Sequence, residues 1–295
     1  MRTAAIILST TLALSAMAGA QDEMPSGAKL IAEGYKFPEG PLVDKDGTLY
    51  FSDVRGSLVL KYDGTDVSVF AENTDGANGL ALHQDGSIYA CLGGGFAIAK
   101  FAPDGTMSTY LKEVDGTPLN QTNDIVIDFN GNIFFSNPGR GDAQSSVVRI
   151  RPDGTAAVVA TDQKYPNGIA ISPDGKTLYV NDLMGVAPIW KYALDAEGEL
   201  SEGEKLVEFG SGFPDGMAVA ESGNIYCALH AKAKIMVVSP GGEVLREIQF
   251  PKGTGVTNMC FGGPDFKTLY VTLGVAGTVY ELPNDEAGMK PYSHR

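Results

Sequence analysis

Short runs of alternating apolar and polar residues fill the chain from about residue 28 onward, and many of them are separated by an Asp-Gly or Asn-Gly pair. This alternation has the period of a β-strand with one buried face, and such pairs are typical of tight hairpin turns. A clear example is YPNGIAISPDGKTLYVND at residues 165–182. Helix-forming stretches between the runs are missing. The pattern therefore predicts an all-β protein built from hairpins.

The hairpin phrase occurs six times along the chain. The copies are PEGPLVDKDGTLYFSD (38–53), ANGLALHQDGSIYACL (77–92), TNDIVIDFNGNIFFSN (122–137), PNGIAISPDGKTLYVND (166–182), PDGMAVAESGNIYCAL (214–229) and TNMCFGGPDFKTLYVTL (257–273). Their second letters are separated by 39, 45, 44, 48 and 43 residues, a period that suits a four-stranded propeller blade. We therefore expect an all-β, six-bladed β-propeller, with four-stranded antiparallel blades around a central channel that the first strand of each blade lines.

Two further patterns predict how the ring closes and how its blades pack. Segment AKLIAEGYK (28–36) precedes the first hairpin, and we expect it to supply the outer strand of the last blade beside GTVYELP (277–283). Such closure leaves no open sheet edge. A Leu-Tyr or Ile-Tyr pair recurs in the second strands, as in Leu178-Tyr179, and we expect these aromatic rings to pack between blades.

The second letter of each phrase carries the candidate chemistry. The turn glycine follows it by eight residues in the first five copies, so all six side chains are expected at one height, at one mouth of the channel. Each ends in a carboxylate or amide oxygen, a donor set that favours a hard cation, calcium first. Taken singly, each Asn or Asp is better explained as a turn residue, and the whole set carries the metal hypothesis. Its members are Glu39, Asn78, Asn123, Asn167, Asp215 and Asn258.

Residues that end the second strands return to the same mouth in this topology. We expect Asn137 and Asp182 to face a substrate there, whereas His230 has two open roles, substrate contact or lining of the rim. His83 and His294 fall on the far face and in the tail, where we expect exposure to solvent.

The first twenty residues have the composition of an export signal. They combine one cation, Arg2, with an apolar stretch and end in small residues at 18–20. We expect cleavage before Gln21, a periplasmic or secreted location, and a single domain over residues 21–295. No later segment is long and apolar enough to predict a transmembrane helix.

Charge and cysteine content restrict the partners. After residue 20 the chain holds 21 basic and 36 acidic residues, a net charge of −15, which disfavours binding to nucleic acid or anionic membranes. We expect a monomer with a small-molecule substrate. Cys91, Cys227 and Cys260 lie in apolar strand-like runs, and the sequence leaves open whether two of them form a disulfide.

The chain resembles the senescence marker protein 30/gluconolactonase/luciferin-regenerating family of six-bladed propellers. The similarity runs in order from about residue 28 to 284 and includes EGPLVDKDGTLYFSDV, LNQTNDIVIDFNGNIFFS, FPDGMAV and TNMCFGGPDFKTLYVT. The resemblance implies a divalent-metal-dependent lactonase. It places metal ligands at Glu39, Asn167 and Asp215, with Asn123 as a further ligand or substrate contact, and the proton donor and acceptor at Asp215.

Two positions depart from the family pattern. Gln121 stands where many members have Arg or Ser, and Ser136-Asn137-Pro138 stands where a TDP motif is common. Both positions are expected to face the substrate. Asn78 and Asn258 match no family ligand, and we interpret them as hydrogen-bonding residues of the channel wall.

The leading hypothesis is a calcium-dependent lactonase, with another divalent cation as an alternative ion. Asp215 is the expected base, and Asp124 and His230 are its rivals because a metal-bound carboxylate is a weakened base. A phosphotriesterase-like hydrolase on the same centre and a non-enzymatic binding propeller with a structural ion stay open; a fully enclosed ion would favour the latter. The expected substrate contacts are Gln121, Asn123, Asp124, Asn137, Asp182 and His230.

Overall fold

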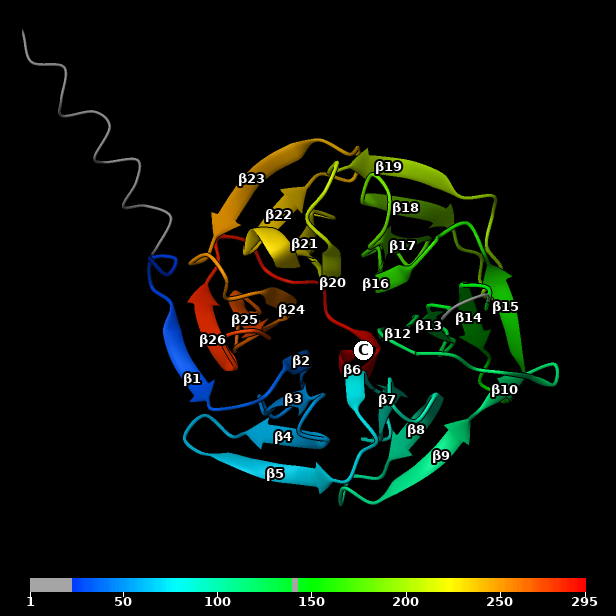
Figure 1. The fold of residues 1–295 in the computed structure, drawn as a ribbon, viewed down its shortest axis with the longest axis horizontal. Coiled ribbons are helices and arrows are strands. Elements are labelled where there is room, and N and C mark those ends of the chain that lie inside the picture. Colours follow the sequence, from blue (N-terminus) through cyan, green and yellow to red (C-terminus); the bar gives the residue numbers. More distant parts are fainter. Residues whose placement is uncertain (1–22, 140–142) are drawn as a thin grey trace, which may run out of the picture.

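Six four-stranded antiparallel sheets surround a central axis in the computed structural model, which describes residues 23–139 and 143–295 (Figure 1). The chain is a six-bladed β-propeller, and the fold prediction is confirmed. The predicted export signal lies outside the described residues. Within the described ranges, no helix has the length and hydropathy needed to cross a bilayer.

Each of the first three blades is one sheet of four consecutive strands, ordered from the channel outward. A two-stranded ribbon, β10 and β11, connects blades 2 and 3. The strands are β2 (Pro38–Val43), β3 (Leu49–Asp53), β4 (Leu58–Tyr62) and β5 (Val67–Glu72) in blade 1; β6 (Ala77–Leu82), β7 (Ile88–Leu92), β8 (Ala97–Phe101) and β9 (Met107–Leu111) in blade 2; β10 (Glu113–Val114) and β11 (Thr117–Pro118) in the ribbon; and β12 (Ile125–Ile127), β13 (Ile133–Asn137), β14 (Ser146–Ile150) and β15 (Ala156–Ala160) in blade 3.

Blades 4 and 5 repeat this order, and blade 6 takes its fourth strand from the start of the chain. Two short 3₁₀ helices complete the described secondary structure. The elements are β16 (Pro166–Ile171), β17 (Thr177–Asp182), β18 (Pro188–Ala193) and β19 (Glu204–Glu208) in blade 4; β20 (Pro214–Val219), β21 (Ile225–Leu229), η1 (His230–Lys232), β22 (Lys234–Val238) and β23 (Val244–Gln249) in blade 5; and β24 (Val256–Gly262), β25 (Thr268–Leu273), β26 (Thr278–Pro283) and β1 (Lys29–Glu33) in blade 6, followed by η2 (Tyr292–His294).

Strand β1 closes the ring by pairing antiparallel with β26. The register places Lys29 opposite Glu281 and Glu33 opposite Thr278, and Lys29 Nζ lies 2.9 Å from Glu281 Oε1. The predicted closure by residues 28–36 is therefore confirmed.

The apolar core is divided among the boundaries between neighbouring blades. Six clusters of buried residues are present, and each spans one boundary. The second-strand tyrosines join them as predicted, for example Tyr179 with Met217 of blade 5 and Tyr270 with Leu49 of blade 1. All three cysteines are free thiols, which answers the open question about a disulfide.

The C-terminal tail, residues 284–295, crosses the mouth of the channel on the side of the hairpin turns, which we call the turn face. Figure 1 shows the C-terminus near the central axis. The Met289 amide donates a hydrogen bond to the Val219 carbonyl (2.9 Å), and the Arg295 guanidinium lies 3.4 Å from the Phe129 ring centroid. Inside the tail the channel keeps a cavity of about 160 Å³, lined in part by Met289 and Tyr292.

The tail overturns the expectation that His83 and His294 are exposed. The His83 ring packs 5.2 Å from Tyr292, and the His294 ring packs 5.2 Å from Phe266. Both histidines are half-buried because the tail folds back over the turns, a long-range contact that the hairpin pattern does not reveal.

Candidate active site

The six second letters of the repeat surround the channel, and we call this set the oxygen ring. It lies at the face opposite the hairpin turns, which we call the ring face. Each blade contacts the next through a residue of the oxygen ring or through the residue beside it in the chain. Asn258 Nδ2 donates a hydrogen bond to Glu39 Oε2 (3.1 Å). A second hydrogen bond joins the Asn167 and Asp215 side chains. In a third, the Gly79 amide donates to the Asn123 carbonyl (2.9 Å).

Glycines beside the ring residues make this close approach feasible. A Cβ atom at Gly216 would lie 2.0 Å from Asn258 Cγ, and one at Gly79 would lie 2.4 Å from Asp124 Oδ1. Real Cβ atoms do not approach other atoms so closely, so the position requires a residue without a side chain. Gly40 and Gly168 lie against the next blade in the same way. The glycine that follows the second letter in four of the six phrases therefore serves packing between blades rather than a turn.

A shift in strand register accompanies the ring position in five blades. The pairing of β2 with β3 shifts between Glu39 and Leu42, and that of β20 with β21 shifts between Pro214 and Met217. Blades 2, 4 and 6 show the same irregularity. A bulge bends a strand and redirects a side chain, and bulges are common next to active sites. In blade 3, Asn123 lies two residues before β12, and its amide donates a hydrogen bond to the Ser136 carbonyl of β13 (3.0 Å).

Three buried carboxylates lie close together at the ring: Glu39, Asp124 and Asp215 are 3%, 7% and 9% exposed. Burial is the main cause that raises the pKa of each, and the charge of Asp124 raises the pKa of Glu39 further. Within the described ranges, no Lys or Arg forms an ion pair with any of them. Buried acids without a positive partner are costly unless they are protonated or bound to a cation.

The donor atoms of the ring fit a hard divalent cation. Asn167 Oδ1 is buried and has no hydrogen-bond partner in the described part of the chain, as expected of an oxygen kept for a ligand. Carboxylate and amide oxygens are the donors that calcium prefers. No three His, Cys, Asp or Glu side chains in the described ranges are arranged as a metal site by themselves. The candidate centre therefore depends on amide oxygens.

The raised carboxyl pKa values predict an unusual pH dependence for the cation-free protein. Carboxyls whose pKa is raised on folding favour the folded state at low pH, and this contribution is lost as pH rises toward the folded pKa, which burial places at about 7 for Asp124. We expect the melting temperature of metal-stripped protein to fall between about pH 5 and pH 8. Thermal melts of dialysed protein check this; a melting temperature that rises over that range would contradict it.

His230 lies at the mouth of the site, beside Asp215. Its Nδ1 atom is 3.7 Å from Asp215 Oδ2, and η1 places it directly after β21. Burial lowers the pKa of His230, which favours the neutral imidazole. The Phe37 ring lies 6.0 Å away, and the Arg55 guanidinium lies 4.5 Å from the Phe37 centroid. The sequence did not indicate Phe37 and Arg55, because neither residue is a second letter of the hairpin phrase.

Asp124 and Gln121 are placed differently from Asp215. Asp124 lines the channel cavity that the tail closes, and its Oδ1 accepts a hydrogen bond from the Ile125 amide (3.0 Å). Gln121 Oε1 accepts a hydrogen bond from the Tyr165 hydroxyl (3.5 Å). Asp215 and His230 thus lie together at the mouth, while Asp124 faces the interior of the channel.

Asn137 and Asp182, expected as substrate contacts, are bound to the protein itself. Asn137 Oδ1 accepts a hydrogen bond from the Asn120 amide (2.8 Å). The Asp182 carboxylate accepts hydrogen bonds from the amides of Lys164 (2.9 Å) and Tyr165 (3.0 Å). Both side chains are buried, and these bonds give them a structural role in holding the loops of the ring face.

Asn181 is a site residue that the sequence did not reveal. Its Oδ1 accepts a hydrogen bond from the Gly168 amide (3.0 Å), and its Nδ2 donates to the Asp215 carbonyl. It therefore joins the ring positions of blades 4 and 5. The signal in the sequence was a polar residue near the end of the second strand, next to the more conspicuous Asp182.

Comparison with known proteins agrees with this geometry. Residues 37–274 match the model of the SMP-30/Gluconolactonase/LRE-like region. The chain belongs to this family. Among its relatives in the SMP-30/gluconolactonase/LRE-like family, a gluconolactonase of Zymomonas mobilis is 29% identical over 280 residues, covering 83% of this chain and 78% of its own. A pentonolactonase of Haloferax volcanii is 28% identical over 271 residues, covering 88% and 91%.

Solved structures of the family share the architecture described above. A gluconolactonase of Xanthomonas campestris superposes with a TM-score of 0.79 at 28% identity, covering 87% of this chain and 89% of its own. The match extends over nearly all of the propeller. The chain with this repeat, oxygen ring and ring closure thus belongs to a family whose members include lactone hydrolases.

Proposed function

We propose that this chain is a lactonase that depends on a divalent cation, and that calcium is the cation. The observation that carries the proposal is the oxygen ring. In the described part of the chain, its buried carboxylates have no Lys or Arg partner, and they lie near an Asn167 oxygen that accepts no hydrogen bond there. The lactonases among the relatives support the reaction class. The substrate is a small molecule, a cyclic ester that water opens to a hydroxy acid.

Glu39, Asn167 and Asp215 hold the cation in this proposal, with Asn123 as a fourth ligand or a substrate contact. When bound, the cation polarises the lactone carbonyl and offsets the negative charge that develops on its oxygen. Asn258 keeps Glu39 in place through its 3.1 Å hydrogen bond. The Asn167 amide holds Asp215 in the same way.

Asp215 is the proposed base. A water molecule attacks the carbonyl carbon and loses a proton to the Asp215 carboxylate; the ring C–O bond then breaks, and the proton passes to the leaving oxygen. Asp215 is preferred over Asp124 because it lies at the mouth beside His230, whereas Asp124 faces the channel cavity that the tail lines. His230 and Gln121 border the substrate, and His230 Nδ1 lies 3.7 Å from Asp215 Oδ2.

A hydrolysis panel tests the proposed function. Sugar, aliphatic and aryl lactones and one phosphotriester are offered to the protein after chelation and again after calcium is restored. We expect lactone hydrolysis that disappears with chelator and returns with calcium. Hydrolysis of the phosphotriester alone would assign the centre to phosphotriesterase chemistry, and no turnover of any compound would favour a binding propeller.

Calcium is expected to raise the melting temperature of the wild type. An ion bound only by the folded state adds about 2.7 kcal/mol at a concentration 100 times its Kd, which corresponds to roughly 5–10 °C in a chain of this size. Glu39→Gln removes the charge of one ligand, so calcium should raise the melting temperature of this variant much less than that of the wild type. Differential scanning calorimetry at matched calcium concentrations measures both, and equal shifts would remove Glu39 from the ligand set.

The proposed location is outside the cytoplasm, after removal of residues 1–20. The support is the sequence alone, with its apolar stretch and the small residues 18–20. Intact-mass measurement of protein recovered from the periplasm or medium should give a chain that starts at Gln21. Retention of Met1 in that fraction would contradict the proposal.

A further inference from the structure

The large apolar side chains that are exposed in the described part of the chain lie in two kinds of place. Seven of them lie on the outermost strands of blades, which face solvent: Leu30, Val69, Met107, Tyr110, Val158, Val244 and Leu245. The other five lie on loops, and all of these loops open on the ring face: Phe96, Met184, Val186, Phe213 and Val275. The mouth of the site therefore has an apolar border that the turn face lacks.

Two of these residues have a backbone conformation that disfavours them. Phe96 and Phe213 adopt φ values of 51° and 57°, in the left-handed region where glycine is preferred. A bulky residue there is strained. The loop position of Phe96 has a positive φ in other blades as well, at Ser57, Ala187 and Ala233, so its strain comes with the repeat. Phe213 is 51% exposed, so burial of its ring does not offset the strain.

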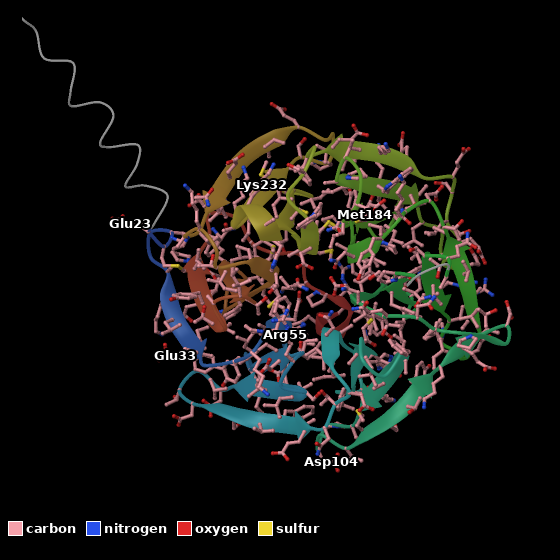
Figure 2. All side chains as sticks on the ribbon, in the orientation of Figure 1. Glu23, Glu33, Arg55, Asp104, Met184 and Lys232 are labelled. Carbon is pink, nitrogen blue, oxygen red and sulfur yellow. The ribbon has the colours of Figure 1, made fainter. Side chains whose placement is uncertain are left out.

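A cleft of about 520 Å³ lies beside Phe213, between blades 4 and 5. Phe213 precedes Asp215 by two residues and Ala231 follows His230. The His230 amide donates a hydrogen bond to the Phe213 carbonyl (3.0 Å), so the cleft lies beside the proposed catalytic pair. Figure 2 shows Met184 over blade 4 and Lys232 over blade 5, the two blades that the cleft separates. Its lining is mainly apolar: Leu183, Met184, Ala187, Phe213 and Ala231, with the Lys232 stem packed along Gly212.

We infer that this cleft binds an apolar substituent of the substrate, so that the substrate class is a lactone with an alkyl or aryl side chain rather than a polyhydroxylated sugar lactone. This inference rests on the proposed lactonase function. Sugar hydroxyls need hydrogen-bonding partners when they are desolvated, and the cleft side chains offer few. An alkyl chain gains up to about fourfold in binding for each methylene that leaves water.

A homologous series of δ-lactones tests the inference. The ring stays constant while the substituent grows from hydrogen to heptyl, and kcat/KM is measured with calcium present. We expect kcat/KM to rise by about two- to fourfold per methylene over the first carbons and then level off. Phe213→Gly suits the positive φ and should fold, and we expect it to lower the ratio of kcat/KM for heptyl over unsubstituted lactone by about tenfold. Met184→Ser should lower the same ratio.

Leu245→Ser is the matched control. Leu245 is 47% exposed, close to the 51% of Phe213, but it lies on β23 at the outside of blade 5. This variant should keep the wild-type ratio. A ratio that falls equally in Leu245→Ser and Phe213→Gly would overturn the inference.

Two outcomes separate this inference from the proposed function. If lactones are hydrolysed but kcat/KM is independent of chain length, or is highest for glucono-δ-lactone, the inference fails and the lactonase stands. If no lactone is hydrolysed, calorimetry with the matching alkyl lactams decides. Affinity that rises with chain length and drops in Phe213→Gly supports the cleft without the lactonase, and equal affinities overturn both.

Discussion

Replacing Asp215 by Asn is expected to lower kcat/KM for lactone hydrolysis by about 10²-fold or more, the scale of losing a general base or a key charge. The amide keeps the size of the side chain and can still hydrogen-bond Asn167. The change also removes a buried carboxyl group. Burial and the neighbouring carboxylates raise the pKa of this group, so its charged form is costly in the folded protein. Cation-free Asp215→Asn should therefore melt no lower than the cation-free wild type. Steady-state kinetics and thermal melts on the same preparation measure both effects.

Two companion variants locate the base if this expectation fails. Asp124→Asn changes a carboxylate that faces the channel cavity, and His230→Ala removes the imidazole at the mouth. We expect His230→Ala to raise KM more than it lowers kcat. If Asp215→Asn folds, binds calcium and hydrolyses lactone at the wild-type rate, the base is one of the other two. The variant with the larger loss of kcat then identifies it.

Deleting residues 285–295 is expected to lower the melting temperature by about 10 °C. Glu286 Oε1 accepts a hydrogen bond from Tyr226 (2.6 Å), and the Gln84 side chain donates to the Tyr292 carbonyl (3.3 Å). Together with the Arg295 contact on Phe129, these tie blades 5, 2 and 3 to the tail. The loss of several such contacts lowers the free energy of unfolding by about 3–5 kcal/mol. In a chain of this size, each kcal/mol corresponds to a change of roughly 2–4 °C in melting temperature.

The single variant Arg295→Ala is the control for that deletion, because it removes one contact and keeps the tail. Its melting temperature should fall by only a small part of the deletion's effect. Calorimetry on the two proteins, each with saturating calcium, makes the comparison. An unchanged melting temperature in the deleted protein would mean that the tail adds nothing to the stability of the ring.

The repeat predicted the propeller because each copy carries its own local signals. Strand alternation and turn glycines depend only on neighbouring residues, so they can be recognised in a single chain. The constant spacing from ring residue to turn glycine then placed Glu39 and Asp215 at one mouth without knowledge of the fold. This part of the site follows from counting residues.

The rest of the site depends on contacts between blades, which local signals do not contain. Gly216 must be glycine because Asn258 of the next blade lies against it, and Asn181 matters because it reaches the Asp215 carbonyl. The register shift at five of the six ring positions is an irregularity that a period of two cannot predict. Asp182 shows the limit of a single position, because an acid at a strand end is equally suited to hold a loop, as it does here, and to contact a ligand.

The pairing of β1 with β26 has a consequence for how the protein is made. Lys29 and Glu281 are 252 residues apart, so the first strand to leave the ribosome waits for the last. Until then β1 belongs to no sheet. Once β26 has formed, β1 and the open edge of β26 can each pair with the complementary strand of a neighbouring chain. Linked dimers that exchange β1 are therefore the expected by-product of expression at high concentration, and a chaperone that covers residues 28–36 should suppress them.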